Sequence, residues 1–274
     1  MLPIFKPHQN IYNWRFELKY RISYQQYLAV RNALVPYMVQ DEYTRSSGRY
    51  IVRSLYYDSD DYQAYYEKIG GDYGRIKLRI RSYSDKAKDA GLLKVELKTK
   101  FGTSMEKHST FVTREDYEYF LANNHWPETK DHVLVEFERL YHLRALKPKV
   151  LLDYRREGYN CRDGGSLRLT FDQQVRSASS ASLFPDPVFF RNHYSHNTVI
   201  LEIKCQDKQP AWLAAIVRQH GLRYIANSKY VQAIEISRPD VINCTAGCFY
   251  PERAVLGIDF PADGARAPRA SVTK

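Results

Sequence analysis

The chain has 274 residues, of which 41 are Lys or Arg and 31 are Asp or Glu, so its formal net charge is +10. This length fits one large domain or two small ones, and the composition excludes fibrous and disordered classes. The excess of positive charge indicates a polyanionic partner, which composition alone leaves open between nucleic acid, an acidic membrane surface and phosphate chains.

The first ten residues lack the apolar core of a secretory signal, and no run of about 18 apolar residues occurs in the sequence. We therefore expect a soluble, cytoplasmic protein. The cysteines show neither CxxC pairs nor a Cys/His ligand pattern, so we expect reduced, non-functional thiols. They are Cys161, Cys205, Cys244 and Cys248.

In chain order, residues 14–23 (WRFELKYRIS) alternate charged with apolar side chains, which predicts a strand with one charged and one apolar face. Ser23 is a good N-cap for a helix over 24–35. Residues 50–58 (YIVRSLYYD) are rich in β-branched and aromatic side chains and predict a second strand. A helix is then expected over 59–71, beginning at a serine followed by two aspartates and ending at two glycines.

The most biased stretch is 75–100, where RIKLRIRS is followed, after a polar turn, by LLKVELKTK. Lys and Arg alternate with Ile, Leu and Val in both halves, and Glu96 is the only acid on the charged side. Because like charges opposed across a sheet repel, this bias indicates a bound anion. The alternative is a basic, solvated face on an ordinary sheet.

The remaining segments mix strands and helices. Strands are predicted near 101–112, 149–156, 166–172 and 198–205, a long loop at 176–197, and helices after Thr113, over 131–145, over 211–220 and from 229. Residues 131–145 are ambiguous between strand and helix, and their length favours a helix. Without a convincing linker, we expect a lead at 1–13, one domain at 14–240 and a tail at 241–274, disordered from about 261.

If these strands close into a barrel, their apolar faces lie either in an inner core or outward beneath the helices. The number of helices with aromatic faces favours the outward arrangement. We therefore expect an α+β fold: a closed antiparallel β-barrel with a charged lumen, jacketed by amphipathic helices. The charged side chains expected in the lumen are Arg15, Lys19, Arg21, Lys77, Arg79, Arg81, Lys94, Lys98, Arg156, Arg168 and Lys204, with Glu17, Glu96 and Glu202.

Cations held this closely repel by roughly 4 kcal/mol per pair at 4 Å when the effective dielectric constant is 20. Triphosphate or a nucleoside triphosphate would neutralise them. The interspersed glutamates are hard oxygen ligands of the kind that hold Mg²⁺ or Mn²⁺ on phosphate oxygens. The pattern therefore suggests phosphoryl transfer, which depends on positioning and charge neutralisation more than on a protein nucleophile.

A series of short motifs resembles, in order, the catalytic domain of polyphosphate polymerases of the vacuolar transporter chaperone (VTC) type. The motifs are ELKYRI, SLYYDSDDYQAYY, KLRIRSY, VELKTK, YRR with the downstream LRLTFD, VILEIK and NSKY. The similarity spans roughly residues 14–236. These polymerases belong to the triphosphate tunnel metalloenzymes (CYTH-like), and the resemblance implies their antiparallel β tunnel.

The resemblance also implies roles for individual residues. The basic residues that grip the triphosphate or the growing chain would be Lys19, Arg79, Arg81, Lys98, Arg156, Arg168 and Lys229, and we take the first four as catalytic. The strand pattern adds Lys77 and Lys204 to the phosphate-binding set, and Lys107 is a less cleanly aligned match to a further family lysine. Glu202 resembles the metal-holding glutamate, and Glu96 and Glu17 are further candidate metal ligands.

The related phosphohydrolase branch opens with Glu-x-Glu-x-Lys, whereas Arg15 stands here in place of the first glutamate. This difference argues against a hydrolase of that branch. We therefore predict an ATP-dependent polyphosphate polymerase, a phosphotransferase that adds the γ-phosphoryl group of ATP to a growing polyphosphate chain with Mn²⁺ or Mg²⁺.

The expected partners are ATP, triphosphate and polyphosphate, with no nucleic acid; a membrane-protein partner for product export and the oligomeric state are left open. Two alternatives stay open as well. One is a metal-dependent hydrolase of triphosphate, nucleotides or RNA 5′ ends that uses the same site. The other is a non-catalytic module that binds polyphosphate or nucleic acid through its basic surface.

Overall fold

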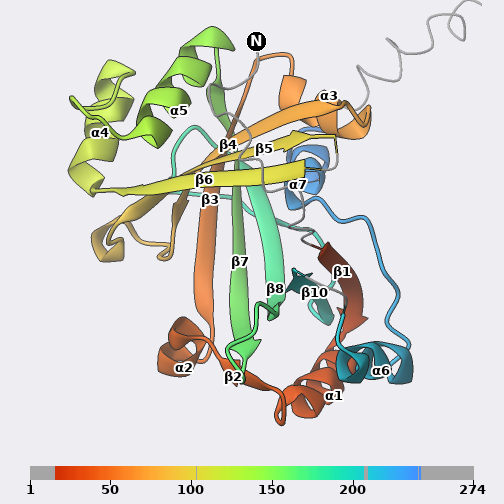
Figure 1. Ribbon diagram of the computed structural model, residues 1–274. Helices are drawn as coiled ribbons and strands as arrows, with labels where there is room; N and C mark the ends of the chain where they lie inside the picture. The colour runs from red at the N-terminus through yellow and green to blue at the C-terminus, as the bar shows by residue number, and fades with distance from the viewer. Residues whose placement is uncertain (1–15, 103, 207–208, 240, 242–274) are drawn as a thin grey trace, which may run out of the picture. The chain divides into compact units, whose positions relative to one another are not determined.

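The computed structural model describes residues 16–102, 104–206, 209–239 and 241, and the chain up to Ser237 forms one compact unit (Figure 1). The predicted lead at 1–13, the tail beyond residue 241, and the residues Arg15, Cys244 and Cys248 lie outside the described part.

One 10-stranded antiparallel sheet dominates the described chain, in the order β1-β10-β8-β7-β3-β4-β5-β6, with β2 paired to β7 and β9 to β8. The strands are β1 (Phe16–Ser23), β2 (Met38–Gln40), β3 (Tyr50–Asp58), β4 (Gly74–Ser82), β5 (Leu93–Phe101), β6 (Ser104–Val112), β7 (Lys147–Cys161), β8 (Arg168–Ser179), β9 (Arg191–Asn192) and β10 (Thr198–Cys205). The basic stretch at 75–100 is the β4–β5 hairpin, as predicted.

The helices are α1 (Tyr24–Leu34), α2 (Glu42–Ser47), α3 (Gln63–Ile69), α4 (Arg114–Asn123), α5 (His132–Leu143), α6 (Ala211–Gln219) and α7 (Lys229–Ser237), with a 3₁₀ turn at Ala87–Asp89. Ser23 caps α1 in a capping box with Gln26, and Thr113 caps α4 in the same way, so both predicted helix starts are confirmed. The ambiguous segment at 131–145 is a helix.

Some elements differ from the sequence prediction. The α3 helix begins at Gln63 rather than at residue 59, because the Ser59 hydroxyl accepts the hydrogen bond of the Gln63 amide and sits before the helix. The short β2 and α2 were not predicted. The end of β8 and all of β9 occupy part of the predicted loop at 176–197. There β8 extends its ladder on β7, and β9 pairs with β8.

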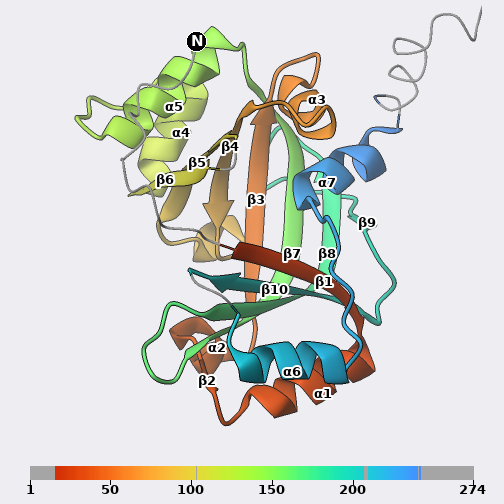
Figure 2. The same cartoon turned by 45° about the vertical axis from the view of Figure 1, so that its right-hand side comes forward.

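Two apolar cores cover the outer side of the sheet. The first lies between the β3–β4–β5 region and the pair α4 and α5, which Figure 1 shows stacked over that end of the sheet. The second lies between β1, β8 and β10 and the helices α1 and α6 (Figure 2). The apolar residues of the basic hairpin belong to the first core, as expected of side chains facing outward against helices; they are Ile76, Leu78, Ile80, Val95 and Leu97.

The predicted closed barrel is wrong: the fold is α+β, but β1 and β6 are the two ends of an open strand order. The physical reason lies at β1, whose outer edge is occupied by a different segment. The Ile225 amide donates to the Lys19 carbonyl at 2.8 Å, and Tyr224 forms an isolated antiparallel bridge with Tyr20. At Lys19 and Tyr20, the outer edge of β1 therefore pairs with residues 224–225 and not with β6.

The sheet is nevertheless strongly curved, with its polar side inward. The Lys98 ammonium on β5 lies 3.7 Å from Glu17 Oε2 on β1, although these strands are far apart in the strand order. The α7 helix is not part of the predicted outer jacket. It packs against β7, β8 and α3 on the polar side, where the Tyr230 ring lies 5.1 Å from the Tyr56 ring, centroid to centroid.

Within the described residues, no helix has both the length and the apolar character needed to cross a membrane.

Candidate functional site

The inward side of the curved sheet, here called the polar face, gathers the charged side chains that the sequence placed on alternate strand positions. Its cations are Lys19, Lys77, Arg79, Arg81, Lys98, Lys107, Arg156, Arg168, Lys204 and Lys229, and its acids are Glu17, Asp41, Glu96, Asp172 and Glu202. All the predicted site residues therefore lie on this face, and cations outnumber carboxylates. Within the described chain, the remaining lumen candidates, Arg21 and Lys94, lie over the rings of Tyr194 and Phe111.

Arg79, Arg81 and Lys107 surround the buried carboxylate of Glu96. Arg79 Nε donates to Glu96 Oε2 at 2.5 Å, Arg81 Nε lies 3.6 Å from the same oxygen, and the Lys107 ammonium pairs with Oε1. Burial disfavours the charged carboxylate, but these three cations hold the pKa of Glu96 well below its usual range. Glu96, predicted as a metal ligand, is thus the counter-ion that orients two arginines.

Those two arginines are also fixed by hydroxyl groups of β3. Arg79 Nη1 donates to the Tyr56 hydroxyl at 2.8 Å, and Arg81 Nε donates to Ser54 Oγ at 3.1 Å. Their guanidinium groups keep further N–H donors, which form a fork suited to phosphate oxygens. The β3–β4 register places the two arginines on the same face.

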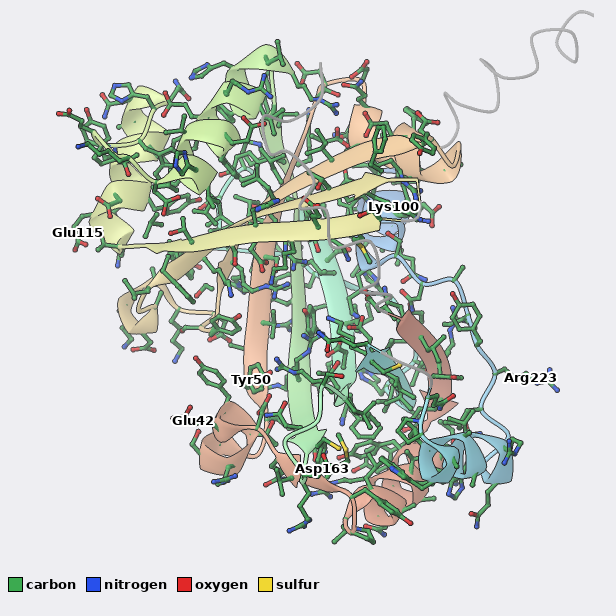
Figure 3. The ribbon with its side chains drawn as sticks, viewed as in Figure 1. Glu42, Tyr50, Lys100, Glu115, Asp163 and Arg223 are labelled. Atoms are coloured by element: carbon green, nitrogen blue, oxygen red, sulfur yellow. The ribbon has the colours of Figure 1, made fainter. Side chains whose placement is uncertain are left out.

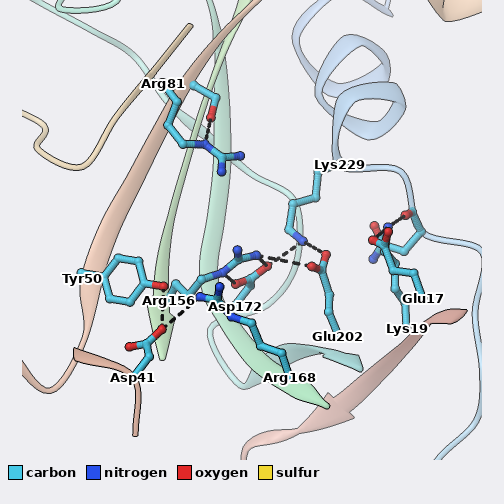
Figure 4. A network of polar contacts seen from close by, with 12 residues as sticks. Glu17, Lys19, Asp41, Tyr50, Arg81, Arg156, Arg168, Asp172, Glu202 and Lys229 are labelled. Atoms are coloured by element: carbon cyan, nitrogen blue, oxygen red, sulfur yellow. Dashed lines mark hydrogen bonds and ion pairs between the residues drawn. The ribbon is translucent and has the colours of Figure 1, made fainter. Parts of the chain in front are cut away.

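A second group joins β7, β8, β10 and α7. Arg156 pairs with Asp172 at 2.6 and 2.8 Å, and the Lys229 ammonium lies 2.7 Å from Asp172 Oδ2 and 2.5 Å from Glu202 Oε1 (Figure 4). Arg156 Nη2 reaches Glu202 Oε2 at 3.4 Å. Burial disfavours the charged form of Glu202, but Lys229 and Arg156 lower its pKa well below the usual range.

Asp172 was not predicted as a site residue, although it is fully buried in this group. The available signal was its spacing of four from Arg168 on a predicted strand, which puts both side chains on one face. Asp172 also resolves the unfavourable placement of a lysine at a helix N-terminus, because its carboxylate and that of Glu202 compensate the charge of Lys229.

Glu17, on β1, connects β1 with β5 across the polar face. Its carboxylate lies 3.0 Å from the Lys19 ammonium and 3.7 Å from that of Lys98. Burial acts against its charge, yet Lys19, Lys98 and Lys204 lower the pKa of Glu17 to about 2. The Lys19 ammonium also donates to the Asn227 carbonyl at 2.9 Å, which fixes its position.

Several lysines of the polar face lack enough negative charge around them. Burial and the neighbouring Lys68 and Lys98 lower the pKa of Lys77 to about 7, and its ammonium lies 4.6 Å from the centre of the Tyr230 ring. Burial lowers the pKa of Lys107 to about 8 even though Glu96 opposes the change. Burial likewise lowers the pKa of Lys98. A polyanion bound here would restore these charges.

Arg168 lies at one end of the polar face, beside α2. Its Nη2 lies 3.1 Å from Asp41 Oδ2, and the same oxygen accepts a hydrogen bond from the Tyr50 hydroxyl at 3.2 Å. Nearly half of the Arg168 side chain is exposed, 46%, so the guanidinium remains open to a ligand.

The carboxylates of the polar face do not make a metal site of their own. Within the described residues, no group of three or more His, Cys, Asp or Glu side chains is arranged to hold a metal ion. Mg²⁺, however, is commonly bound through one or two carboxylates together with substrate phosphates. Glu202 and Glu17 are close enough that the charge of Glu202 acts to raise the pKa of Glu17. Their carboxylates offer hard oxygen atoms of this kind and fit a metal that binds together with its phosphate ligand.

The family model of the VTC domain matches residues 14–238. A comparison with curated proteins finds no match. Similar solved structures include a protein of Bacillus halodurans described as a candidate adenylate cyclase, with 14% identity, a TM-score of 0.48, and coverage of 79% of this chain and 94% of that one.

Two further solved structures are similar at a comparable level. The PH1819 protein of Pyrococcus horikoshii OT3 has 14% identity and a TM-score of 0.44, and the alignment covers 81% of this chain and 98% of that one. A candidate adenylate cyclase of Vibrio parahaemolyticus has 13% identity and a TM-score of 0.41, with coverage of 85% and 99%. At such low identities and TM-scores, these likenesses carry no functional argument.

Proposed function

Because the chain belongs to the VTC domain family, we propose that it is a polyphosphate polymerase that transfers the γ-phosphoryl group of ATP to a growing polyphosphate chain. The observation that carries this proposal is the polar face itself, where cations exceed carboxylates and burial lowers the pKa of Lys77, Lys98 and Lys107. Such a face is unfavourable when empty and is relieved by a dense polyanion.

The reaction needs no protein nucleophile. A terminal phosphate oxygen of the chain attacks the γ-phosphorus, the bond from that phosphorus to the β–γ bridging oxygen breaks, and ADP leaves with the electron pair. Arg79, Arg81, Lys98 and Lys19 are proposed to hold the transferred group, because positioning and charge neutralisation dominate phosphoryl transfer. The longer phosphate chain is proposed to lie along Arg156, Arg168, Lys204, Lys229, Lys77 and Lys107.

A divalent cation, Mn²⁺ or Mg²⁺, would be held by Glu202 and Glu17 together with phosphate oxygens and would neutralise charge on the β- and γ-phosphates. Glu96 is proposed to orient Arg79 and Arg81, since Arg79 Nε donates to its carboxylate at 2.5 Å and Arg81 Nε lies 3.6 Å from the same oxygen.

The low pKa values of the glutamates on the polar face favour a polymerase over a hydrolase. Cations lower the pKa of Glu17, Glu96 and Glu202 against the effect of burial, which makes these groups poor bases for activating water. A chain-end phosphate is already anionic and needs no such base. Arg15, which stands where the hydrolase motif has its first glutamate, also argues against a hydrolase of that branch.

Incubation of the purified protein with ATP and Mn²⁺ tests the proposal. The expected products are ADP and acid-labile phosphate chains that resolve as a ladder on a denaturing gel. Release of orthophosphate and ADP without chains would assign the protein as a hydrolase. Binding of tripolyphosphate without turnover of ATP, with either metal present, would assign it as a non-catalytic polyphosphate-binding module.

A further inference from the structure

Three tyrosine rings gather at one end of the polar face. Tyr43 lies on α2, Tyr50 begins β3, and Tyr83 follows directly after β4. The rings of Tyr43 and Tyr83 are nearly parallel, with 10° between their planes and 5.8 Å between their centres. Tyr50 completes the group, with its ring centre 5.4 Å from that of Tyr43 and 6.2 Å from that of Tyr83.

This tyrosine group is not part of an apolar core. Tyr43 is 55% exposed, and Tyr50 and Tyr83 are partly exposed. An aromatic side chain that only fills a core is normally buried, whereas exposed and stacked rings offer a flat surface to a planar ligand.

The surface is held in place by a short network beneath α2. The Gly158 amide donates to Thr44 Oγ1 at 2.7 Å, and the Asp41 amide donates to the Gly158 carbonyl at 2.8 Å. Asp41 also caps α2 through the Thr44 amide at 2.9 Å. These bonds fix α2, and with it Tyr43, to β7.

The tyrosine group is continuous with the phosphate-binding cations. Tyr50 is the register partner of Arg156, and its hydroxyl shares the Asp41 carboxylate with Arg168 (Figure 4). Tyr83 stands two residues beyond Arg81. A ligand that has both an aromatic ring and a chain of phosphates would therefore meet the two kinds of group in succession.

The other end of the polar face has a different character. Lys68, Arg75 and Lys100 gather there, and burial with the nearby charges of Arg75 and Lys100 lowers the pKa of Lys68. Figure 3 shows Lys100 well separated from Tyr50. At this end, where β4 begins and β5 ends, the exposed Tyr73 packs edge-on against Phe101, with ring centres 4.5 Å apart.

We propose that Tyr43, Tyr50 and Tyr83 form a platform that binds the base of the donor nucleotide by stacking, so that its phosphates extend past Arg168 and Arg156 toward Arg79 and Arg81. This inference rests on the proposed function, since it takes the nucleoside triphosphate as donor. Stacking accepts any base, because every base has a flat π face, so the platform separates nucleotides from inorganic phosphate chains and not ATP from GTP.

Calorimetric titration of ATP and of inorganic tripolyphosphate tests the platform. Tyr43→Ala should weaken ATP binding about tenfold, in line with the loss of one stacked ring, while changing tripolyphosphate binding less than about twofold. Tyr43→Phe should keep the ATP affinity, because the ring is retained. Tyr73→Ala is the matched control, an exposed tyrosine at the opposite end, and should change neither affinity.

Three results would overturn the platform: equal loss of both ligands in Tyr43→Ala, no loss of either, or a loss of ATP affinity in Tyr73→Ala. Thermal melting of each variant shows whether it is folded. The titrations measure binding and not chain synthesis, so a protein that makes no polyphosphate but shows the Tyr43 effect retains the platform and loses the polymerase assignment. Chain synthesis without a loss of ATP affinity in Tyr43→Ala would support the polymerase assignment and overturn the platform.

Discussion

The Lys229 ammonium at the start of α7 lies 2.5 Å from Glu202 Oε1 on β10, and both side chains are nearly buried, at 10% and 7% exposure. The pair fastens α7 to the polar face and also brings a phosphate-binding candidate against a metal-ligand candidate. Fold and proposed chemistry therefore depend on the same contact.

Replacement of Lys229 by Met should destabilise the protein strongly. It leaves Asp172 and Glu202 with less compensation in a buried setting, where loss of one partner costs about 3–5 kcal/mol. Chemical denaturation should show a lower midpoint, while Lys229→Arg, which keeps the charge, should recover most of the loss. An unchanged midpoint for Lys229→Met would mean that α7 is held by its apolar contacts alone.

Arg79→Ala should abolish most chain synthesis while leaving the fold intact. Arg79 is proposed to hold the transferred phosphoryl group, and removal of one preorganised donor typically costs about 100-fold or more in kcat. Glu96 keeps Arg81 and Lys107 as partners, so a large loss of stability is not expected. The control is Arg114→Ala, which removes an arginine paired with the exposed Glu118 on α4. Equal activity of the two variants would remove Arg79 from the site.

The affinity for tripolyphosphate should fall as pH rises through about 7 and then about 8, the pKa values to which burial lowers Lys77 and Lys107. A polyanion binds the protonated lysines better, so binding takes up protons in this window and weakens above it. Calorimetry in buffers of different ionisation enthalpy measures this uptake. Lys77→Met should remove the lower step, and an identical pH profile in that variant would contradict the assignment.

The same lysine affects stability in the opposite sense. Without ligand, burial and neighbouring lysines lower the folded-state pKa of Lys77 to about 7 from its ordinary value of 10.5, so the unfolded chain binds more protons between these values. The free energy of unfolding should therefore rise with pH across that range. Lys77→Met should flatten this rise, as followed by denaturation in the absence of phosphate; the same slope in both proteins would speak against it.

The faces of the strands could be predicted from the sequence because alternation directly determines which side chains point together. The pattern in the β4–β5 hairpin predicted that Arg79 and Lys98 lie on the face opposite the apolar core. Ser23 and Thr113 likewise marked two helix starts through short-range hydrogen bonds. These are local relations, and local chemistry is what a single sequence records best.

Long-range relations were not predictable in this way. The open sheet follows from backbone pairing of Ile225 with Lys19, and no side-chain pattern reports which edge a connecting segment will occupy. Asp172 was missed as a site residue because its partners, Arg156 and Lys229, come from other elements. The role of Asp41 likewise depends on its contact with Arg168, across the fold.

Gly158→Ala should weaken both stability and ATP binding. A Cβ atom at Gly158 would overlap the Asp41 carboxylate, which caps α2 and contacts Arg168. The resulting strain should cost about 1–3 kcal/mol, seen as a lower melting temperature, and the displacement of α2 should move Tyr43 and lower the affinity for ATP more than that for tripolyphosphate. Gly91→Ala is the matched control, because a Cβ there meets nothing within 4 Å. If Gly158→Ala melted and bound ATP like Gly91→Ala, α2 would not depend on this close approach, and the anchoring of the tyrosine platform would have to come from elsewhere.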